Sequence, residues 1–355
     1  MKPYDAVDFF SVDTLLDDEE KMIRDTVRSW VSKELIPVIE KHDREGTFPK
    51  HLIPQLAEMG TLGATIKGYE CAGLSYTAYG LIMQELERGD SGLRSFVSVQ
   101  GALCMFPISA YGTEEQKQKY LPKMARGEII GCFGLTEPDF GSDPGGLITR
   151  ARKEGNSYVL NGAKMWITNG GIADVAIVWA KTEDNVIRGF LVDKGTKGFS
   201  TRDTHGKFSL RASVTSELIF EDCRIPAENL LPNVQGLKGP FGCLNNARFG
   251  IAWGALGAAQ ACFDEARRYA KTRIMFNRPI GSYQLVQGKL AYMLQEITKG
   301  QLLALQLGRM KDAGKCTPQH ISLAKMNNVS EALKIARMAR DILGANGITD
   351  EYQAG

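Results

Sequence analysis

A change in sequence texture divides the chain into three parts and constrains its fold more than any other feature. Apolar residues recur at helical spacing up to about residue 124. From Gly131 to about Leu231 short β-rich runs alternate with turn signals, and from Phe241 the helical period returns. This order indicates an α+β fold. We expect an N-terminal all-α domain at 1–128, a central β barrel or sandwich at 129–238 and a C-terminal helical domain at 239–355.

Capping residues predict where several helices begin and end. The acidic residues that start at Asp17 suit the positive end of a helix dipole. Thr113 with Gln116 fits a capping box, and Gly314 suits a helix end. The longer helices are expected at 17–42, 243–272, 282–312 and 318–343.

The central segment is predicted to be a small antiparallel sheet domain, because its short runs are rich in β-branched and aromatic residues. Asn161–Gly162 and Asn169–Gly171 predict turns between strands. The expected strands are Tyr158–Leu160, Met165–Thr168, Val175–Trp179, Arg188–Val192 and Val214–Phe220.

Charge and composition exclude several classes of function. The 43 Lys and Arg residues nearly balance the 41 Asp and Glu residues, which argues against a nucleic-acid or membrane-surface protein. No apolar run approaches the ~20 residues of a membrane-spanning helix. Acidic residues crowd the first twenty positions, unlike a targeting peptide, so we expect a cytoplasmic, bacterial-type protein, with the mitochondrial matrix as the alternative. The seven cysteines and four histidines are scattered and predict no metal site.

Two stretches carry residues suited to a flat, polar cofactor. Phe133–Asp143 contains Thr136, Gly141 and Ser142, and Met165–Asn169 contains Trp166 and Thr168. An isoalloxazine ring needs an apolar wall and hydrogen-bond donors at its edge, and these residue types supply both. On composition alone, each stretch is more often a turn or a core strand than a cofactor site, and it is their co-occurrence that points to a cofactor. No Gly-rich phosphate loop or G-x-S-x-G motif is present.

These stretches belong to a longer series of motifs. F-G-L-T-E-P-x-x-G-S-D, K-M-W-I-T-N, A-R-F-G-I-A-W-G-A-L-G-A-A, R-x-x-F-x-R-P-I and D-I-L-G-A-N-G-I follow in order. The series resembles the FAD-dependent acyl-CoA dehydrogenases over residues 8–352. Within that family, Glu87–Ser95 and Phe241–Arg248 are most similar to the glutaryl-CoA dehydrogenases.

The resemblance implies the three-domain acyl-CoA dehydrogenase fold and a homotetramer with FAD at a subunit interface. Arg273, Gln284 and residues 341–345 would reach the FAD of a neighbouring subunit, with Arg273 as the partner of its pyrophosphate. Asn277 departs from the glycine usual in that motif. The implied cofactor contacts are Phe133, Leu135, Thr136, Gly141, Ser142, Trp166, Ile167, Thr168, Arg273, Phe276, Gln284, Asp341, Leu343 and Gly344.

The resemblance also implies oxidation and decarboxylation of glutaryl-CoA to crotonyl-CoA, as in lysine and tryptophan degradation. An electron-transfer flavoprotein would be the electron acceptor. Arg94 would pair with the second carboxylate of the substrate, and Glu87 would assist decarboxylation, unless Glu87 is an ordinary exposed helix charge. The implied substrate contacts are Arg94, Ser95, Ser142, Phe241, Asn245 and Arg248.

The family's catalytic base is not found in this sequence. Relatives carry a Glu in a Tyr-Glu-Gly-Thr motif after the segment that matches 344–352, and here only Gln353, Ala354 and Gly355 follow. Some relatives place the base at the position of Ala247 instead. Glu137 and Glu351 lie near cofactor motifs, but no pattern puts them at the substrate. We therefore expect an incomplete C-terminal bundle without a catalytic residue: an early-ending dehydrogenase or, alternatively, a non-catalytic paralogue that binds acyl-CoA and FAD.

Overall fold

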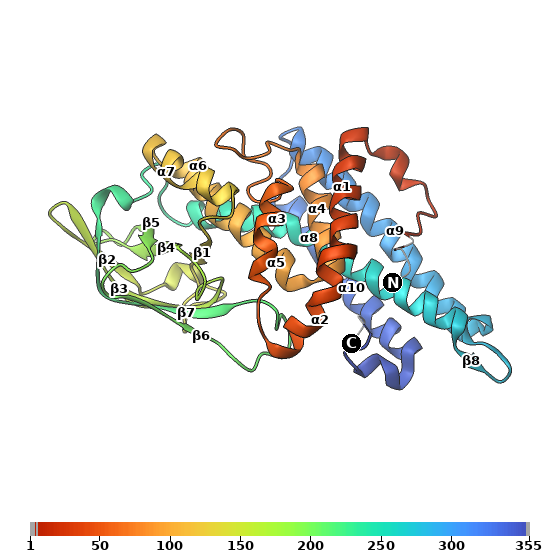
Figure 1. Ribbon diagram of the computed structural model, residues 1–355. Coiled ribbons are helices and arrows are strands. Elements are labelled where there is room, and N and C mark those ends of the chain that lie inside the picture. Colours follow the sequence, from red (N-terminus) through yellow and green to blue (C-terminus); the bar gives the residue numbers. More distant parts are fainter. Residues whose placement is uncertain (1–3, 5, 353–355) are drawn as a thin grey trace. The chain divides into compact units, whose positions relative to one another are not determined.

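Helices precede and follow a sheet in this computed structural model, which describes Tyr4 and residues 6–352 (Figure 1). This order confirms the expected α+β fold. The helices are α1 (Asp18–Trp30), α2 (Ile36–Glu45), α3 (Ile53–Glu58), α4 (Tyr76–Gly89), α5 (Ser91–Ser98), α6 (Phe106–Tyr111), α7 (Glu114–Ala125), α8 (Lys238–Thr272), α9 (Gln284–Asp312) and α10 (Pro318–Leu343). The strands are β1 (Gly131–Gly134), β2 (Arg150–Glu154), β3 (Ser157–Thr168), β4 (Val175–Lys181), β5 (Ile187–Asp193), β6 (Phe199–Asp203), β7 (Thr215–Pro226), β8 (Ile274–Met275) and β9 (Arg278–Pro279).

Most predicted helix ends are confirmed by their caps. The Asp17 carboxylate accepts from the Glu20 N–H at 2.8 Å, and Thr113 and Gln116 form the expected capping box. Gly314 follows α9 with a φ of 68°, a conformation that glycine adopts without strain. The helix expected at 17–42 is instead α1 and α2, joined by a π-helical turn at Val31–Leu35.

The chain forms two compact units, and the first contains residues up to 44, 75–94 and 248–355. Within this unit α1 packs against α4, α4 against α9, and α9 against α10 (Figure 1). The C-terminal part of α8 buries Ala259, Phe263 and Ala266 in a core shared with Met293 and Ile335.

The second unit contains residues 45–74 and 95–247 and holds the sheet. The strand order is β1-β4-β2-β3-β7-β6, with β5 paired to β4. Most pairings are antiparallel, but β4 pairs in parallel with β1 and with β2, so the expected purely antiparallel domain is corrected. The predicted turn at Asn161–Gly162 is also wrong, because β3 continues through it with a bulge opposite β7.

The two faces of β4 bury side chains in two different cores. Val175, Ile177 and Trp179 join a core with residues of α6 and α7 and of the π-helical turn at Val99–Met105. Ala176 and Val178 face a core formed with β3, β5 and β7. A strand buried on both faces is expected to be apolar, as β4 is from Val175 to Ala180.

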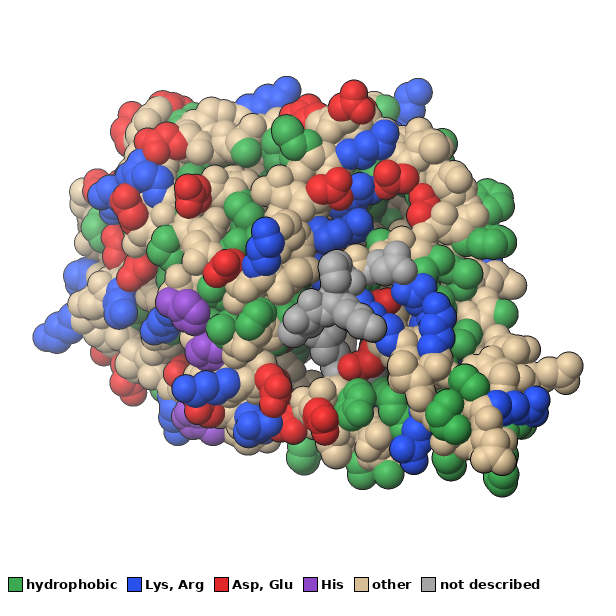
Figure 2. Space-filling view, turned by 45° about the vertical axis from the view of Figure 1, so that its right-hand side comes forward, with side chains coloured by type: hydrophobic (Ala, Val, Ile, Leu, Met, Phe, Trp, Pro, Cys, Tyr) green, Lys and Arg blue, Asp and Glu red, His purple; other side chains and the backbone are tan. Residues whose placement is uncertain are grey.

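The surface is mixed in charge. Figure 2 shows Lys and Arg side chains interspersed with Asp and Glu on the face that it presents, in line with the near-zero net charge. Contrary to the expectation from the sequence, one stretch, Ser91–Tyr111, has the length and apolar composition of a membrane-spanning helix. However, 67% of its apolar window is buried inside the structure, which is typical of a core helix.

Candidate active site

A pocket of about 340 Å³ opens between the loop that follows β1, the end of β3 and the first turns of α8. All eight residues predicted to contact FAD within one subunit line it, together with Phe241. Sequence reasoning missed four further lining residues, Val99, Leu103, Pro144 and Leu244. The complete lining is Val99, Leu103, Phe133, Leu135, Thr136, Gly141, Ser142, Pro144, Trp166, Ile167, Thr168, Phe241 and Leu244.

Trp166 is held at the pocket by a distorted strand. The pairing of β3 with β7 shifts register between Lys164 and Ile167, and Trp166 adopts a φ of 62°. This region of backbone space is strained for an aromatic residue, and such strain persists where the surrounding structure imposes it. The bulge leaves the indole side chain 60% exposed, where it can stack on a flat ligand.

The loop from Leu135 to Thr149, here called the β1–β2 loop, forms the opposite wall. It is tied to β3 by the Met165 N–H, which donates to the Thr136 carbonyl at 2.8 Å. Space is open above Gly141, where a Cβ atom would meet nothing within 4 Å. This absence of a side chain lets a ligand approach the backbone.

Hydroxyl groups around the pocket are available to a ligand. Those of Thr136, Ser142 and Thr168 make no hydrogen bond to any other residue in the described part of the chain. Phe133 and Leu135 supply apolar surface beside them. An apolar wall with free hydroxyls at its edge fits an isoalloxazine ring, so the pocket suits FAD.

A buried ion pair that sequence reasoning did not predict joins the β1–β2 loop to β3. The Lys164 ammonium donates to the Glu137 carboxylate at 2.8 Å, and both side chains are at most 1% exposed. Burial lowers the pKa of Lys164 to about 8. Burial acts to raise the pKa of Glu137, but Lys164 and the N–H groups of residues 148 and 149 bring it below its usual value. No spacing rule links residues 27 positions apart, which is why the motifs did not reveal the pair.

Arg94 and Glu87, predicted to act on the substrate carboxylate, form an ion pair in the first unit. Arg94 Nε donates to Glu87 Oε2 at 2.6 Å, and Ser91 Oγ donates to Glu87 Oε1 at 2.9 Å. Each side chain of the ion pair is only 10% exposed, so Glu87 is not an ordinary exposed helix charge. Arg94 Nη1 makes no hydrogen bond among the described residues and is free to bind a second carboxylate.

Gly254 of α8 provides space for this ion pair. A Cβ atom at position 254 would collide with Glu87 Oε2 and lie 3.4 Å from Arg94 Nε. A larger residue would therefore push the Glu87 carboxylate away from its position beside Arg94.

Phe241, Asn245 and Arg248 are spaced by four and three residues along α8, so they lie on one face of the helix. The Arg248 Nη2 donates to Ser322 Oγ at 2.6 Å. Ser95, which follows Arg94 on α5, is half-buried. Ala247, the alternative base position, is a buried apolar side chain.

The residues expected to reach a neighbouring subunit's FAD are mostly exposed. The Arg273 guanidinium makes no hydrogen bond or ion pair to the described residues, and Phe276 is 88% exposed. Gln284 is the exposed first residue of α9, and Asp341 pairs with Lys289. Leu343 is buried in the core of its unit, which does not present it to a neighbouring subunit, and Gly344 caps α10.

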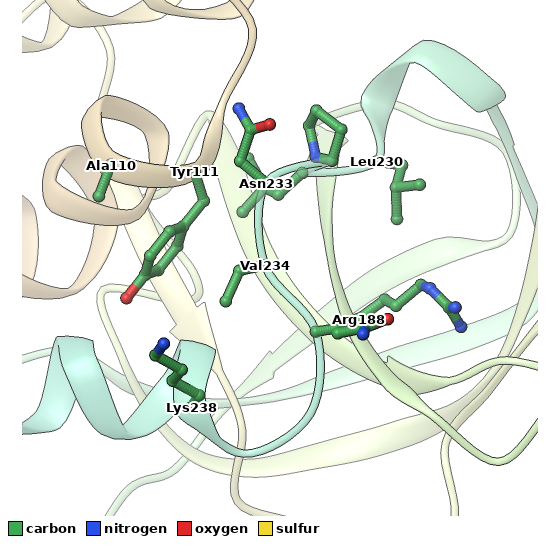
Figure 3. A pocket seen from close by; sticks show the side chains of 10 residues that line it. Ala110, Tyr111, Arg188, Leu230, Asn233, Val234 and Lys238 are labelled. Carbon is green, nitrogen blue, oxygen red and sulfur yellow. The ribbon is translucent and has the colours of Figure 1, made fainter.

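A larger hollow, about 920 Å³, lies elsewhere in the second unit (Figure 3). Tyr111, Asn233 and Lys238 line it, but none of the predicted site residues does. Arg188 at its edge is already paired with Asp184 at 2.8 Å. Among the described residues, no group of His, Cys, Asp or Glu side chains is arranged to hold a metal ion.

Comparison with known proteins agrees with this geometry. Models of the N-terminal, middle and C-terminal domains of acyl-CoA dehydrogenases match residues 17–128, 132–223 and 235–355. The rat mitochondrial short-chain specific acyl-CoA dehydrogenase is 38% identical over 345 residues, 96% of this chain and 84% of that protein.

Two solved structures are also similar. A glutaryl-CoA dehydrogenase from Mycobacterium smegmatis, in complex with FADH2, is 53% identical with a TM-score of 0.97, covering 99% of this chain and 91% of its own. An electron transferring flavoprotein structure from Acidaminococcus fermentans is 35% identical with a TM-score of 0.92, covering 96% and 91%. Because all three domain models match in order and the pocket carries the flavin motif residues, the chain belongs to the acyl-CoA dehydrogenase family, as an oxidoreductase with FAD as cofactor.

Proposed function

We propose that this enzyme oxidises and decarboxylates glutaryl-CoA to crotonyl-CoA, as in the degradation of lysine and tryptophan. The observation that carries the proposal is the nearly buried Arg94, whose Nε edge is held by Glu87 while Nη1 stays free. A short acyl chain with a second carboxylate matches this donor. A monocarboxylic chain would leave Arg94 Nη1 without an acceptor. A site built to bind a polar group discriminates strongly against a ligand that lacks that group.

Glu87 gives decarboxylation a physical basis. Because Glu87 shares the guanidinium, Arg94 cannot fully neutralise a second carboxylate bound beside it. Loss of CO₂ moves the negative charge from that carboxylate toward the thioester and so relieves the repulsion with Glu87. Glu87 thus destabilises the bound carboxylate that leaves.

The second unit would hold the cofactor. The hydroxyls of Thr136, Ser142 and Thr168 would bind polar edges, while Trp166 and Leu135 would exclude water from the ring. Bound FAD would supply the acceptor for the hydride that leaves the substrate β-carbon. Phe241, Asn245 and Arg248 would bind the acyl-CoA along α8.

We further propose a homotetramer in which Arg273 and Gln284 contact the FAD of another subunit, and an electron-transfer flavoprotein as acceptor. The exposed, unpaired Arg273 guanidinium supports the first proposal. The similarity to the Acidaminococcus fermentans structure supports the second.

Glu137 is unsuited to act as the base that removes the α-proton. Its carboxylate already accepts from Lys164, Ile148 N–H and Thr149 N–H, and it is almost fully buried. A general base must be free to reach the proton that it removes, and these three contacts already occupy the Glu137 carboxylate.

A binding experiment tests the proposed substrate without requiring turnover. The FAD-loaded protein is titrated with glutaryl-CoA and with butyryl-CoA, and the perturbed flavin absorbance gives each Kd. We expect tighter binding of glutaryl-CoA, and we expect Arg94→Gln to weaken it by about 10- to 100-fold while hardly changing butyryl-CoA. Equal affinities in the unmodified protein would overturn the glutaryl assignment but leave the dehydrogenase family intact.

A further inference from the structure

Lys164 and Glu137 are buried charges that the proposed reaction does not use. Lys164 lies on β3 and Glu137 in the β1–β2 loop, and their side chains are 0% and 1% exposed. Replacing a buried ion pair with apolar side chains of similar volume often leaves stability unchanged or improves it. Stability alone therefore does not account for charges at these two positions.

The pair ties the β1–β2 loop together at both ends. Glu137 lies near the start of the loop, and its carboxylate accepts from the N–H groups of Ile148 at 2.6 Å and Thr149 at 3.0 Å, at the loop's end. Lys164 Nζ donates to Glu137 and also to the Leu135 carbonyl at 3.2 Å. The carboxylate and the ammonium thus fix the loop at four residues, namely Leu135, Glu137, Ile148 and Thr149.

The two segments joined by this pair are the walls of the flavin pocket. Thr136, Gly141 and Ser142 belong to the loop, while Trp166 and Thr168 follow Lys164 on β3. The register shift that turns Trp166 outward begins directly after Lys164. A displacement at Lys164 or Glu137 would therefore change the spacing between the two walls.

We propose that the Glu137–Lys164 ion pair is a positioning device, which holds the β1–β2 loop against β3 at the spacing that FAD requires. Neither residue contacts the reacting atoms. They act through Thr136 and Trp166, whose positions they fix.

The titration of Lys164 gives a second, independent test of the proposal. Burial lowers the pKa of Lys164 to about 8, and Glu137 is the only titratable group facing it among the described residues. Above this pH Lys164 loses its charge, and the carboxylate loses the partner that holds the loop. The affinity for FAD should then fall between pH 7 and pH 9.

The test compares the unmodified protein with three variants, each FAD-loaded for the thermal and spectroscopic measurements and freed of FAD for the titration. Lys164→Met leaves a buried carboxylate without its partner. The double variant Glu137→Gln with Lys164→Met removes both charges but keeps an amide oxygen to accept from the loop N–H groups. Glu217→Gln is the control, because Glu217 forms an ion pair with the exposed Arg202 on strands of the same sheet.

We measure the thermal midpoint, the Kd for FAD and the visible circular dichroism of the flavin. Lys164→Met should lower the midpoint and weaken FAD binding about tenfold or more. In the double variant the midpoint should recover, while FAD binding stays weak, its flavin dichroism stays altered and its FAD affinity no longer changes between pH 7 and pH 9. Glu217→Gln should match the unmodified protein. A double variant with unaltered FAD affinity and dichroism would overturn the proposal and leave the pair with a structural role only.

Discussion

At the scale of single residues, the buried carboxylate of Asp90 lowers the free energy of unfolding when it is charged. It lies between α4 and α5, and its carboxylate accepts from the Leu93 N–H at 2.6 Å, at the start of the helix that carries Arg94. Burial raises its pKa from 3.8 to about 6, and the nearby Asp43 and Glu87 act in the same direction. The folded protein therefore holds this proton more tightly than the unfolded chain between these pH values. The free energy of unfolding falls as the pH rises through that window.

Asp90→Asn should consequently stabilise the protein at pH 7. Asparagine keeps an oxygen for the Leu93 N–H but carries no charge to bury. Urea unfolding at pH 7 and at pH 4 measures the effect. The gain over the unmodified protein should shrink toward pH 4, where Asp90 is itself protonated in the folded state. A gain that is equal at the two values would mean that the charge is not the cause.

Arg273 gives a second prediction at this scale. Its guanidinium is exposed and unpaired among the described residues, as a phosphate-binding arginine should be before its ligand arrives. Arg273→Ala should weaken FAD binding by about 10- to 100-fold, measured by fluorescence titration. Lys271→Ala removes the same charge two residues away and should have little effect. Similar losses in the two variants would indicate a general electrostatic attraction instead of a specific contact.

Sequence motifs predicted the pocket residues because those residues are close together in the sequence. Thr136, Gly141 and Ser142 fall within seven positions, as do Trp166 and Thr168. The Glu137–Lys164 ion pair depends on the folding of two distant segments against each other, and local spacing contains no signal for it. Likewise, the ion pair between Glu87 and Arg94 depends on how α4 and α5 are oriented, which the sequence does not show.

At the scale of elements, glycines decide how closely α4 and α8 approach. A Cβ atom at Gly257 would overlap the Gln84 backbone carbonyl oxygen, which cannot move without shifting α4. Gly257→Ala should therefore lower the free energy of unfolding by about 1–3 kcal/mol or more. Gly288 of α9 is the matched control, since a Cβ atom there meets nothing within 4 Å. Gly288→Ala should instead stabilise by about 0.5–1 kcal/mol, because alanine favours the helix.

Urea denaturation of the two glycine variants checks this contrast. Opposite signs are expected from the same chemical change in two helices of one unit. A neutral Gly257→Ala would show that α4 and α8 can separate at little cost, contrary to the backbone contact seen here.

Element boundaries were predictable where local signals dominate and not where pairing does. The bounds of α10 agree with the sequence, because Pro318 can begin a helix and Gly344 can end one. The turn predicted at Asn161–Gly162 is wrong because β2 and β7, which pair with β3 on its two sides, keep these residues within the strand. The Asn161 side chain bonds to Asp222 across the bulge, with its Oδ1 accepting from the Asp222 N–H at 2.9 Å, and this contact replaces the expected turn.

At the scale of the whole molecule, we expect ligand binding without efficient catalysis. The pocket in the second unit is lined without any Asp or Glu among the described residues, and the two carboxylates discussed above, Glu87 and Glu137, are already paired with Arg94 and Lys164. A polypeptide of residues 1–355 alone should therefore bind FAD and glutaryl-CoA yet bleach its flavin very slowly.

The magnitude follows from the missing chemistry. Loss of a general base typically costs about 10²–10⁴-fold in rate. Joining a family C-terminus that contains Tyr-Glu-Gly-Thr after Tyr352 should restore flavin bleaching and CO₂ release in stopped-flow and gas measurements. The same extension with Gln in place of that Glu should bind FAD and remain inactive.

Rapid turnover by residues 1–355 alone would instead point to a base within them. Glu87 would then be the first residue to replace, since Lys164 already holds Glu137.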